Sequence, residues 1–124
     1  MRSSRSSKDY YKPVDLLFVY GTLRSGFDNR YAKLLRAQAE LVGPAEVKGS
    51  IFRIADYPGY RPEPAGTVHG ELYRLADPEA TLRILDEYEG PEYERLARED
   101  CWIYQFRTQP PESAHIPSGD FCRP

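Results

Sequence analysis

The 124-residue sequence has few of the residues that bind metals or form disulfide frameworks. It contains two cysteines, Cys101 and Cys122, and two histidines, His69 and His115. The cysteines lie far apart without CxxC spacing, whereas metal sites and disulfide scaffolds need several such residues at short, defined spacings. We therefore expect no metal site and no disulfide framework.

Long hydrophobic runs and an excess of one charge are also absent from the sequence. No stretch approaches the roughly 20 apolar residues of a membrane-spanning helix, and no signal-peptide segment precedes the first predicted strand. The 17 basic and 19 acidic residues are interspersed and give a net charge of −2. This pattern predicts neither a nucleic-acid nor a membrane partner, and we expect a cytoplasmic protein.

Turn-forming residues and tyrosine are abundant. Eleven prolines and nine glycines predict many turns, and ten tyrosines suit strands and pocket walls because tyrosine has an apolar body and a polar tip. The length allows one core. Residues 1–13 are polar, Ser-rich and basic, which predicts a disordered N-terminal tail, and residues 14–124 are expected to form one domain.

Several segments have the composition of β-strands. They are residues 15–20, 47–54, 67–75, 93–96 and 101–106. The first of them is continuously apolar, which is typical of a strand that is covered on both faces. Residues 57–64 are rich in proline and glycine and are expected to form a long loop. Few residues separate the last two strands, so a hairpin between them must be short.

Two helices are predicted. Asp28 or Asn29 can cap a first helix that runs to about Ala37, and Asp77 can cap a second helix that ends before Gly90. Strands outnumber helices, and two helices cannot cover both faces of an open sheet. The pattern therefore predicts an α+β domain with a strongly curved or barrel-like sheet.

Glu89 is the most informative charged residue. At about 100° per residue, Glu89 shares a helix face with Leu82 and Leu85, while Asp86 falls on the other side and is expected to face water. Burial and the negative end of the helix dipole both disfavour a charged carboxylate at this position. Both effects raise the pKa of Glu89 toward neutrality, where a carboxylate can accept and return a proton. From spacing alone, a solvated Glu at a frayed helix end is the alternative.

The loop after the first strand is a candidate ligand site. Tyr20-Gly21-Thr22-Leu23 begins where backbone N–H groups lose their partners in the sheet, and Gly21 leaves the backbone open to a ligand. Successive N–H groups in such a loop can bind a carboxylate. The pattern alone is weak, and Tyr20 suits a core or wall position equally well.

Other segments are also candidates for the site. Gly49 with Ser50 begins a strand with a small pair, and Gly70-Glu71-Leu72-Tyr73 repeats that design, so both segments suit close packing. Tyr93 and Arg95 follow the second helix within a few residues and can return beside Glu89. Arg95 suits an ion pair as well as a contact with a substrate.

Taken in order, these motifs resemble the gamma-glutamylcyclotransferase-like family, also called AIG2-like, which includes gamma-glutamylamine cyclotransferase. The motifs that carry the resemblance are Phe-Val-Tyr-Gly-Thr-Leu-Arg at 18–24 with Gly26 and Asn29, Gly49, Pro-Gly at 58–59, Gly-Glu-Leu-Tyr at 70–73, Leu-Asp-Glu-Tyr-Glu-Gly at 85–90 and Tyr-Glu-Arg at 93–95. The C-terminal Ile-Pro-Ser-Gly-Asp is similar to the ending of many bacterial members. The resemblance covers about residues 16–121.

The resemblance implies a mixed, barrel-like sheet with flanking helices. It also implies cleavage of a gamma-glutamyl amine or peptide by attack of its own α-amine, which releases 5-oxoproline and a free amine without a cofactor. Glu89 matches the catalytic residue of the family. The implied substrate-binding residues are Tyr20, Gly21, Thr22, Leu23, Gly49, Tyr93 and Arg95.

Residues 57–64 and the segment near Arg98 are expected to contact the leaving amine, because loops on a rigid scaffold usually set specificity. The only partner predicted is a small-molecule gamma-glutamyl substrate, and the sequence does not indicate an oligomeric state. One alternative is a non-catalytic small-molecule-binding or regulatory module with the same pocket. Another is a protein-interaction domain, which would have a flat apolar surface instead of a pocket.

Overall fold

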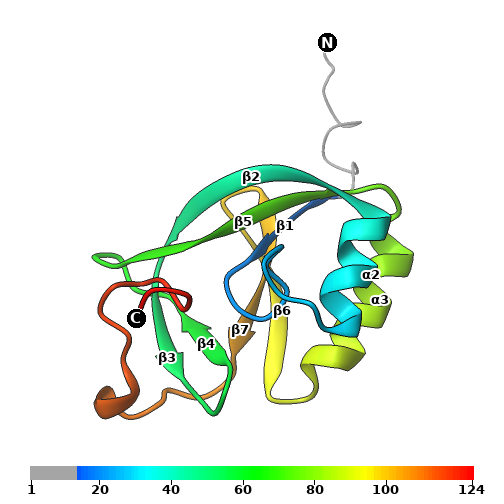
Figure 1. Cartoon of the computed structure of the whole chain (residues 1–124). Coiled ribbons are helices and arrows are strands. Elements are labelled where there is room, and N and C mark those ends of the chain that lie inside the picture. The colour runs from blue at the N-terminus through cyan, green and yellow to red at the C-terminus, as the bar shows by residue number, and fades with distance from the viewer. Residues whose placement is uncertain (1–13) are drawn as a thin grey trace.

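The computed structural model describes residues 14–124, so the predicted tail at residues 1–13 lies outside the described residues. The described part contains seven strands and two α-helices (Figure 1). In chain order the elements are β1 (Leu16–Val19), α2 (Arg30–Gln38), β2 (Ala39–Lys48), β3 (Ser50–Arg53), β4 (Pro58–Arg61), β5 (Thr67–Leu75), α3 (Pro78–Glu89), β6 (Tyr93–Arg98), β7 (Cys101–Phe106) and a short 3-10 helix, η1 (Glu112–Ala114). None of these helices is long and apolar enough to cross a membrane.

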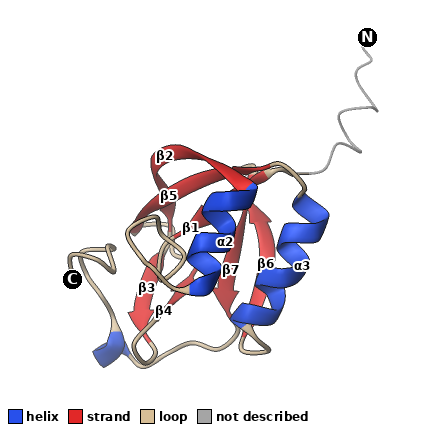
Figure 2. Ribbon diagram, turned by 45° about the vertical axis from the view of Figure 1, so that its right-hand side comes forward, coloured by secondary structure: helices blue, strands red, loops and turns tan. Residues whose placement is uncertain are grey.

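The strands form one mixed sheet in the order β2-β5-β1-β7-β4-β3, and β6 also pairs with β7. The β1–β7 and β4–β7 pairs are parallel, and the other pairs are antiparallel. The sheet curls strongly, and α2 and α3 lie side by side against it (Figure 2). The predicted α+β fold, with a mixed, curved, barrel-like sheet and flanking helices, is confirmed.

Strand β7 organises the site because two other strands pair with it in parallel. Leu17 of β1 pairs with Trp102 of β7, and Tyr60 of β4 pairs with Gln105 farther along the same strand. The antiparallel strand β6 pairs with β7 along its whole length. The chain therefore leaves the sheet after β1 close to the point where β4 joins it.

The core lies on both faces of β1. Leu17 packs with helix residues such as Leu35 and Leu85, whereas Phe18 packs with Ile51 and other residues on the opposite face. Successive side chains along a strand point to opposite faces, and Leu17 and Phe18 are both almost completely buried. Both faces of β1 are therefore covered. The continuous apolar run at β1 is thus explained, as predicted, by a strand that is covered on both faces.

Two strand boundaries differ from the sequence-based expectation. The strand predicted at residues 47–54 is broken at Gly49, whose φ of +154° strains most other residues. A Cβ atom there would also overlap the Tyr60 ring. The loop predicted at 57–64 was wrong in part, because β4 begins at Pro58 and pairs with β3.

Strand β2 had no clear sequence signal before Val47. Its residues Leu41 and Val42 are both exposed, and within the described part of the chain β5 is the one strand that pairs with it. An edge strand with little burial does not need the regular apolar alternation that marks a half-buried strand.

The predicted helix ends are confirmed. The Asn29 side chain, rather than Asp28, accepts hydrogen bonds from the N–H groups of Tyr31 (3.1 Å) and Ala32 (2.8 Å) at the start of α2. Asp77 caps α3, and Gly90 ends it with a φ of +83°. Glu89 is therefore fixed in the last turn of a capped helix.

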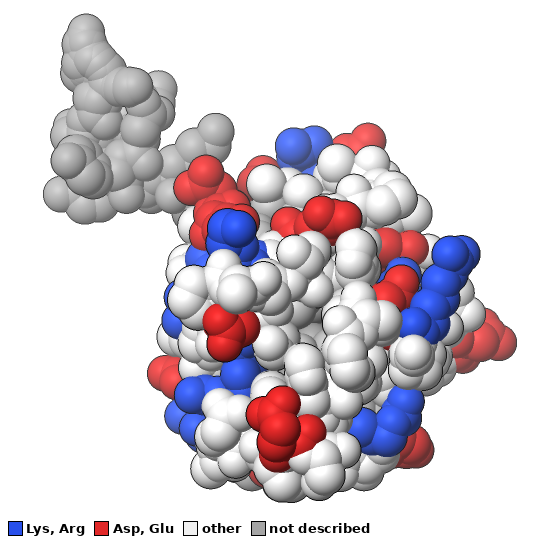
Figure 3. Space-filling view, turned by 90° about the vertical axis from the view of Figure 1, so that its left-hand side faces the viewer, with Lys and Arg blue, Asp and Glu red and all other residues white. Residues whose placement is uncertain are grey.

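The strands β6 and β7 form the short hairpin that the sequence predicted. Glu99 and Asp100 both have positive φ, 51° and 68°, as a two-residue turn between twisted strands requires. On the face of the molecule in Figure 3, basic and acidic side chains are interspersed and form no patch of one sign.

Candidate active site

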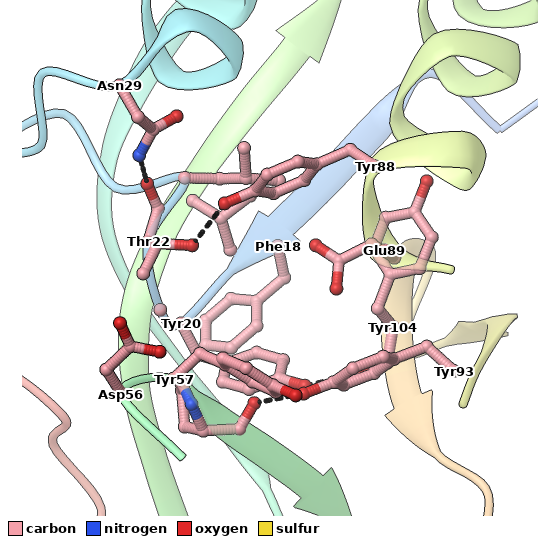
Figure 4. A pocket seen from close by; sticks show the side chains of 14 residues that line it. Phe18, Tyr20, Thr22, Asn29, Asp56, Tyr57, Tyr88, Glu89, Tyr93 and Tyr104 are labelled. Atoms are coloured by element: carbon pink, nitrogen blue, oxygen red, sulfur yellow. Dashed lines mark hydrogen bonds between the residues drawn. The ribbon is translucent and has the colours of Figure 1, made fainter. Parts of the chain in front are cut away.

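A cavity of about 340 Å³ opens where β1 parts from the sheet and meets the end of α3. Its size is at the small end of the range for small-molecule sites, about 300–1,000 Å³. Residues from the loop after β1, the β3–β4 turn, the end of α3, and β6 and β7 line it (Figure 4). They are Phe18, Val19, Tyr20, Gly21, Thr22, Leu23, Asn29, Asp56, Tyr57, Pro58, Tyr88, Glu89, Tyr93 and Tyr104.

Tyr20 stabilises the split in the sheet beside this cavity. Its hydroxyl donates a hydrogen bond to the backbone C=O of Tyr104 (2.6 Å) and accepts one from the N–H of Tyr60 (3.0 Å). The hydroxyl thus bridges β7 and β4 where β1 diverges. Burial raises the pKa of Tyr20 well above its ordinary value, so the phenol stays protonated as a donor.

The loop after Tyr20 is held from two sides. The N–H and hydroxyl of Ser25 donate to the carboxylate of Glu71 (2.6 and 2.8 Å), and Arg24 forms an ion pair with Asp120 (2.8 Å). Gly21 is needed on the inner side, because a Cβ atom there would lie 2.8 Å from the Pro58 ring. The loop is therefore fixed close to the first residue of β4.

The same loop offers backbone donors to the cavity. Within residues 14–124, the N–H groups of Gly21, Thr22 and Leu23 have no hydrogen-bond acceptor. The C=O of Thr22 is held by the side-chain amide of Asn29 (2.7 Å), and its hydroxyl lies 2.7 Å from the hydroxyl of Tyr88. Three successive unpaired N–H groups in a fixed loop are suited to binding an anion such as a carboxylate.

Glu89 lies across the cavity from this loop, and its carboxylate points into the space between them (Figure 4). Burial raises the pKa of Glu89 to about 7, and the negative charge of Asp86 adds to the effect. Among the described residues, no cation or hydrogen-bond donor pairs with the Glu89 carboxylate. Glu89 can therefore exchange a proton near neutral pH.

Asp86 is partly exposed to water, with 41% of its side chain accessible, but it also has partners that the helical spacing did not predict. Its carboxylate accepts hydrogen bonds from Arg95 at two positions (2.7 and 3.1 Å) and from the hydroxyl of Tyr104 (2.7 Å). Burial alone would raise the pKa of Asp86, but these bonds outweigh burial and hold the pKa below its ordinary value. The hairpin β6–β7 brings both partners to Asp86, which helical periodicity cannot predict.

The predicted site residues divide into two groups. Six of them line the cavity: Tyr20, Gly21, Thr22, Leu23, Glu89 and Tyr93. Gly49 instead joins β2 to β3 and lines a separate groove. Arg95 lies in a shallow groove on the other side of the α3 end, where it binds Asp86 and packs over the Trp102 ring at 4.3 Å.

The structure adds residues that the sequence did not single out for the site. Asn29, Asp56, Tyr88 and Tyr104 line the cavity, and Tyr93 donates to the C=O of Pro58 (2.6 Å). Tyr88 sits inside the helix-end motif, which was a usable signal, whereas nothing in the sequence marked Asp56.

The predicted specificity segments reach the cavity only in part. Of residues 57–64, Tyr57 and Pro58 line it, and Arg98 does not. Among residues 14–124, no three His, Cys, Asp or Glu side chains come together as a metal centre.

The profile of the family described as "Gamma-glutamyl cyclotransferase, AIG2-like" matches residues 17–123. The chain belongs to this family. A Vibrio cholerae protein with a provisional gamma-glutamylcyclotransferase name is 37% identical in an alignment of 116 positions that covers 87% of this chain and 96% of that protein. The gamma-glutamylaminecyclotransferase of Bos taurus is 32% identical over 84% of this chain and 73% of its own length.

Solved structures of this family share the fold. The crystal structure of a mouse AIG2-like protein superimposes with a TM-score of 0.62 at 28% identity, over 79% of this chain and 80% of the mouse chain. The gamma-glutamylcyclotransferase-like resemblance of the sequence motifs is thus confirmed at the level of the family.

Proposed function

We propose that this protein is a cyclotransferase that cleaves a gamma-glutamyl amine or gamma-glutamyl peptide into 5-oxoproline and a free amine. The observation that carries the proposal is the pairing of two features across one cavity. Glu89, a carboxylate with a pKa of about 7, faces the loop at residues 21–23 and its three N–H groups, and none of these groups has a partner within residues 14–124.

The loop is suited to the α-carboxylate of the gamma-glutamyl group. In this proposal the N–H groups of Gly21, Thr22 and Leu23 bind that carboxylate, which leaves the α-ammonium group on the side of Glu89. The cavity is lined mainly by aromatic and aliphatic side chains, and such surroundings strengthen both contacts relative to water. The substrate is thereby held with its α-nitrogen free to reach its own γ-carbonyl carbon.

The proposed reaction needs orientation and one proton acceptor. Glu89 takes a proton from the α-ammonium group, and the resulting amine attacks the γ-carbonyl carbon to form the five-membered ring. The bond between that carbon and the leaving nitrogen then breaks. The attacking nitrogen loses a second proton as the leaving nitrogen gains one, and the released amine takes up the proton held by Glu89.

Two physical effects support catalysis by this arrangement. The attack is intramolecular, so fixing the substrate in one conformation supplies much of the acceleration, and the protein needs no nucleophile of its own. A pKa of about 7 leaves Glu89 partly deprotonated at neutral pH and able to give the proton back.

The test is incubation with a panel of gamma-glutamyl amines and peptides, with release of 5-oxoproline and of the free amine measured separately. We expect equal amounts of both products with at least one substrate and loss of both in Glu89→Gln. Binding of gamma-glutamyl compounds without any product would replace the enzyme by a non-catalytic binding module. Absence of both binding and product would contradict the proposed substrate.

A further inference from the structure

The C-terminal segment at residues 115–121 links two strands of the sheet. The N–H of Ile116 donates to the C=O of Ile51 in β3 (3.0 Å), and the C=O of Gly119 accepts a hydrogen bond from the N–H of His69 in β5 (2.8 Å). In Figure 1 this segment, drawn in orange to red, lies beside β3. Strands β3 and β5 are not neighbours in the sheet order, so the segment ties together two separate parts of the sheet.

The turn that follows this link fixes the position of Asp120. Gly119 has a φ of +71°, and a Cβ atom there would overlap the backbone oxygen of Thr67, so the position requires glycine. The N–H of Asp120 donates to the hydroxyl of Ser118 (3.1 Å), and its carboxylate accepts a hydrogen bond from the N–H of Cys122 (3.0 Å). The Asp120 carboxylate is thus held in one place by its own turn.

Asp120 reaches the loop after β1 and pairs with Arg24. Its carboxylate accepts a hydrogen bond from the Arg24 guanidinium (2.8 Å), and only 16% and 18% of the Arg24 and Asp120 side chains are exposed. Burial alone would raise the pKa of Asp120, but the bonds from Arg24 and Cys122 outweigh burial and hold the pKa below its ordinary value. The rings of Phe27 and Phe121 stack at 6.4 Å and join the same two segments. The loop is therefore tied to the C-terminal segment at two places.

Arg24 directly follows the three N–H groups at residues 21–23 but lies outside the lining of the cavity. Its own N–H donates to the C=O of Gly21 (3.1 Å) and closes a turn around these residues. Its guanidinium is bound to Asp120 instead of facing the cavity. The place of Arg24 therefore affects the direction of the N–H groups, although Arg24 itself does not touch a ligand there.

We propose that Asp120 is a positioning residue for substrate binding: by holding Arg24, it fixes the direction of the N–H groups of residues 21–23 that bind the α-carboxylate. This inference rests on the proposed function, in which that loop binds the glutamyl end of the substrate. The Ile-Pro-Ser-Gly-Asp ending at residues 116–120 takes no direct part in the proposed reaction. Its role is to hold the loop that does.

Geometry and electrostatics predict opposite effects of removing the Asp120 charge. If Asp120 acts by fixing the loop, Asp120→Asn weakens the contact with Arg24 and should weaken binding of the α-carboxylate. If the positive charge of Arg24 acted directly on the substrate, the same change would leave that charge uncompensated and would tighten binding of the carboxylate. The sign of the effect therefore separates the two roles.

The kinetic test uses the gamma-glutamyl amide of pentylamine. Asp120→Asn should raise KM by about 5- to 20-fold and leave kcat within about twofold of wild type, because the weakened contact acts on substrate and transition state alike. Arg24→Gln should have the same effect, and the double variant should be no worse than the more affected single variant, since both act through one pair. Glu112→Gln is the matched control, because it removes an exposed acid near the same end of the chain and should leave KM unchanged.

A binding measurement tests the same assignment without turnover. In Glu89→Gln protein, calorimetry compares this amide with an analogue in which a carboxamide replaces the α-carboxylate. We expect tighter binding of the carboxylate compound, and the added Asp120→Asn change should reduce the ratio of the two dissociation constants by about 5-fold or more. A general loss of structure would weaken both compounds alike and leave this ratio unchanged, which would overturn the positioning role.

The outcomes separate this inference from the proposed function. If the compounds bind without turnover, the proposed reaction is wrong, while the ratio of dissociation constants still decides the role of Asp120. If wild type releases 5-oxoproline and Asp120→Asn has an unchanged or lower KM, the reaction stands and the positioning role is overturned. Binding of neither compound would overturn both.

A second variant covers the case in which Asp120→Asn does not fold. Arg24→Gln then replaces it, and the hydrogen exchange of the Phe27 N–H, which donates to the C=O of Arg24 (3.0 Å), reports on the loop. The positioning role requires faster exchange of this hydrogen together with a lower ratio of dissociation constants. Unchanged exchange would overturn it, because the pair would then not hold the loop.

Discussion

Two carboxylates in the last turn of α3 have pKa values that are shifted in opposite directions. Asp86 faces the β6–β7 hairpin, where Arg95 and Tyr104 bind it and hold its pKa below the ordinary value. Glu89, three residues later, faces the cavity without a partner among the described residues, and burial raises its pKa to about 7. The comparison shows that the surroundings of each side chain, rather than the helix, decide which acid exchanges protons.

The largest effect is expected from removing the unpaired acid. Glu89→Gln keeps the size of the side chain but cannot accept a proton, so kcat for 5-oxoproline release should fall by about 10²–10⁴-fold. Glu87→Gln, an exposed neighbour on the same helix, is the matched control and should retain activity. Near wild-type turnover of the Glu89 variant would remove this residue from the proton transfer.

The same substitution should stabilise the fold in a pH-dependent way. The folded-state pKa of Glu89, about 7, lies above its ordinary value of 4.5, so wild type loses stability as the pH rises between these values. Glu89→Gln should therefore be more stable than wild type at pH 8, by up to about 3 kcal/mol.

Denaturant unfolding at several pH values measures this difference. The advantage of Glu89→Gln should vanish below about pH 4.5, where the carboxylate is neutral in both the folded and the unfolded state. An advantage that is the same at pH 4 and pH 8 would show that the charge of Glu89 is not its cause.

Asp86→Asn removes the charge that adds to the raised pKa of Glu89. The pKa of Glu89 should fall, so the acidic limb of the kcat/KM profile should move to lower pH. Stability should decrease by about 1 kcal/mol, because Arg95 and Tyr104 lose a charged acceptor in a partly exposed pair. A limb that stays in place would leave Asp86 with a structural role only.

The smallest effect is expected from Arg95→Gln, and its direction distinguishes an electrostatic role from a structural one. Asp86 then loses its counter-charge, so the pKa of Glu89 should rise and the acidic limb should move to higher pH, opposite to the Asp86→Asn shift. Loss of structure alone would lower activity at every pH and would not move the two limbs in opposite directions. Lys is a suitable conservative replacement at position 95 and should restore the wild-type profile in part.

The local pattern predicted much of this molecule. The apolar run at β1, the caps of both helices and the glycine that ends α3 all follow from short-range rules that act within a few residues. The same rules placed Glu89 on the inner face of α3. They failed for β2, since its exposed residues carry no regular alternation, and for the break at Gly49, which depends on the distant Tyr60 ring.

Contacts between distant segments decided the rest. The sequence by itself determined which residues form the helix end and the loop after β1, and that Glu89 is disfavoured as an anion. Only the tertiary structure determines that Asp56 lines the cavity, that Arg95 lies outside it, and that Arg95 pairs with Asp86. The physical reason is that a strand or helix pattern specifies which face of an element is buried, whereas the partner on that face depends on how the sheet curls and on where β1 and β4 meet β7.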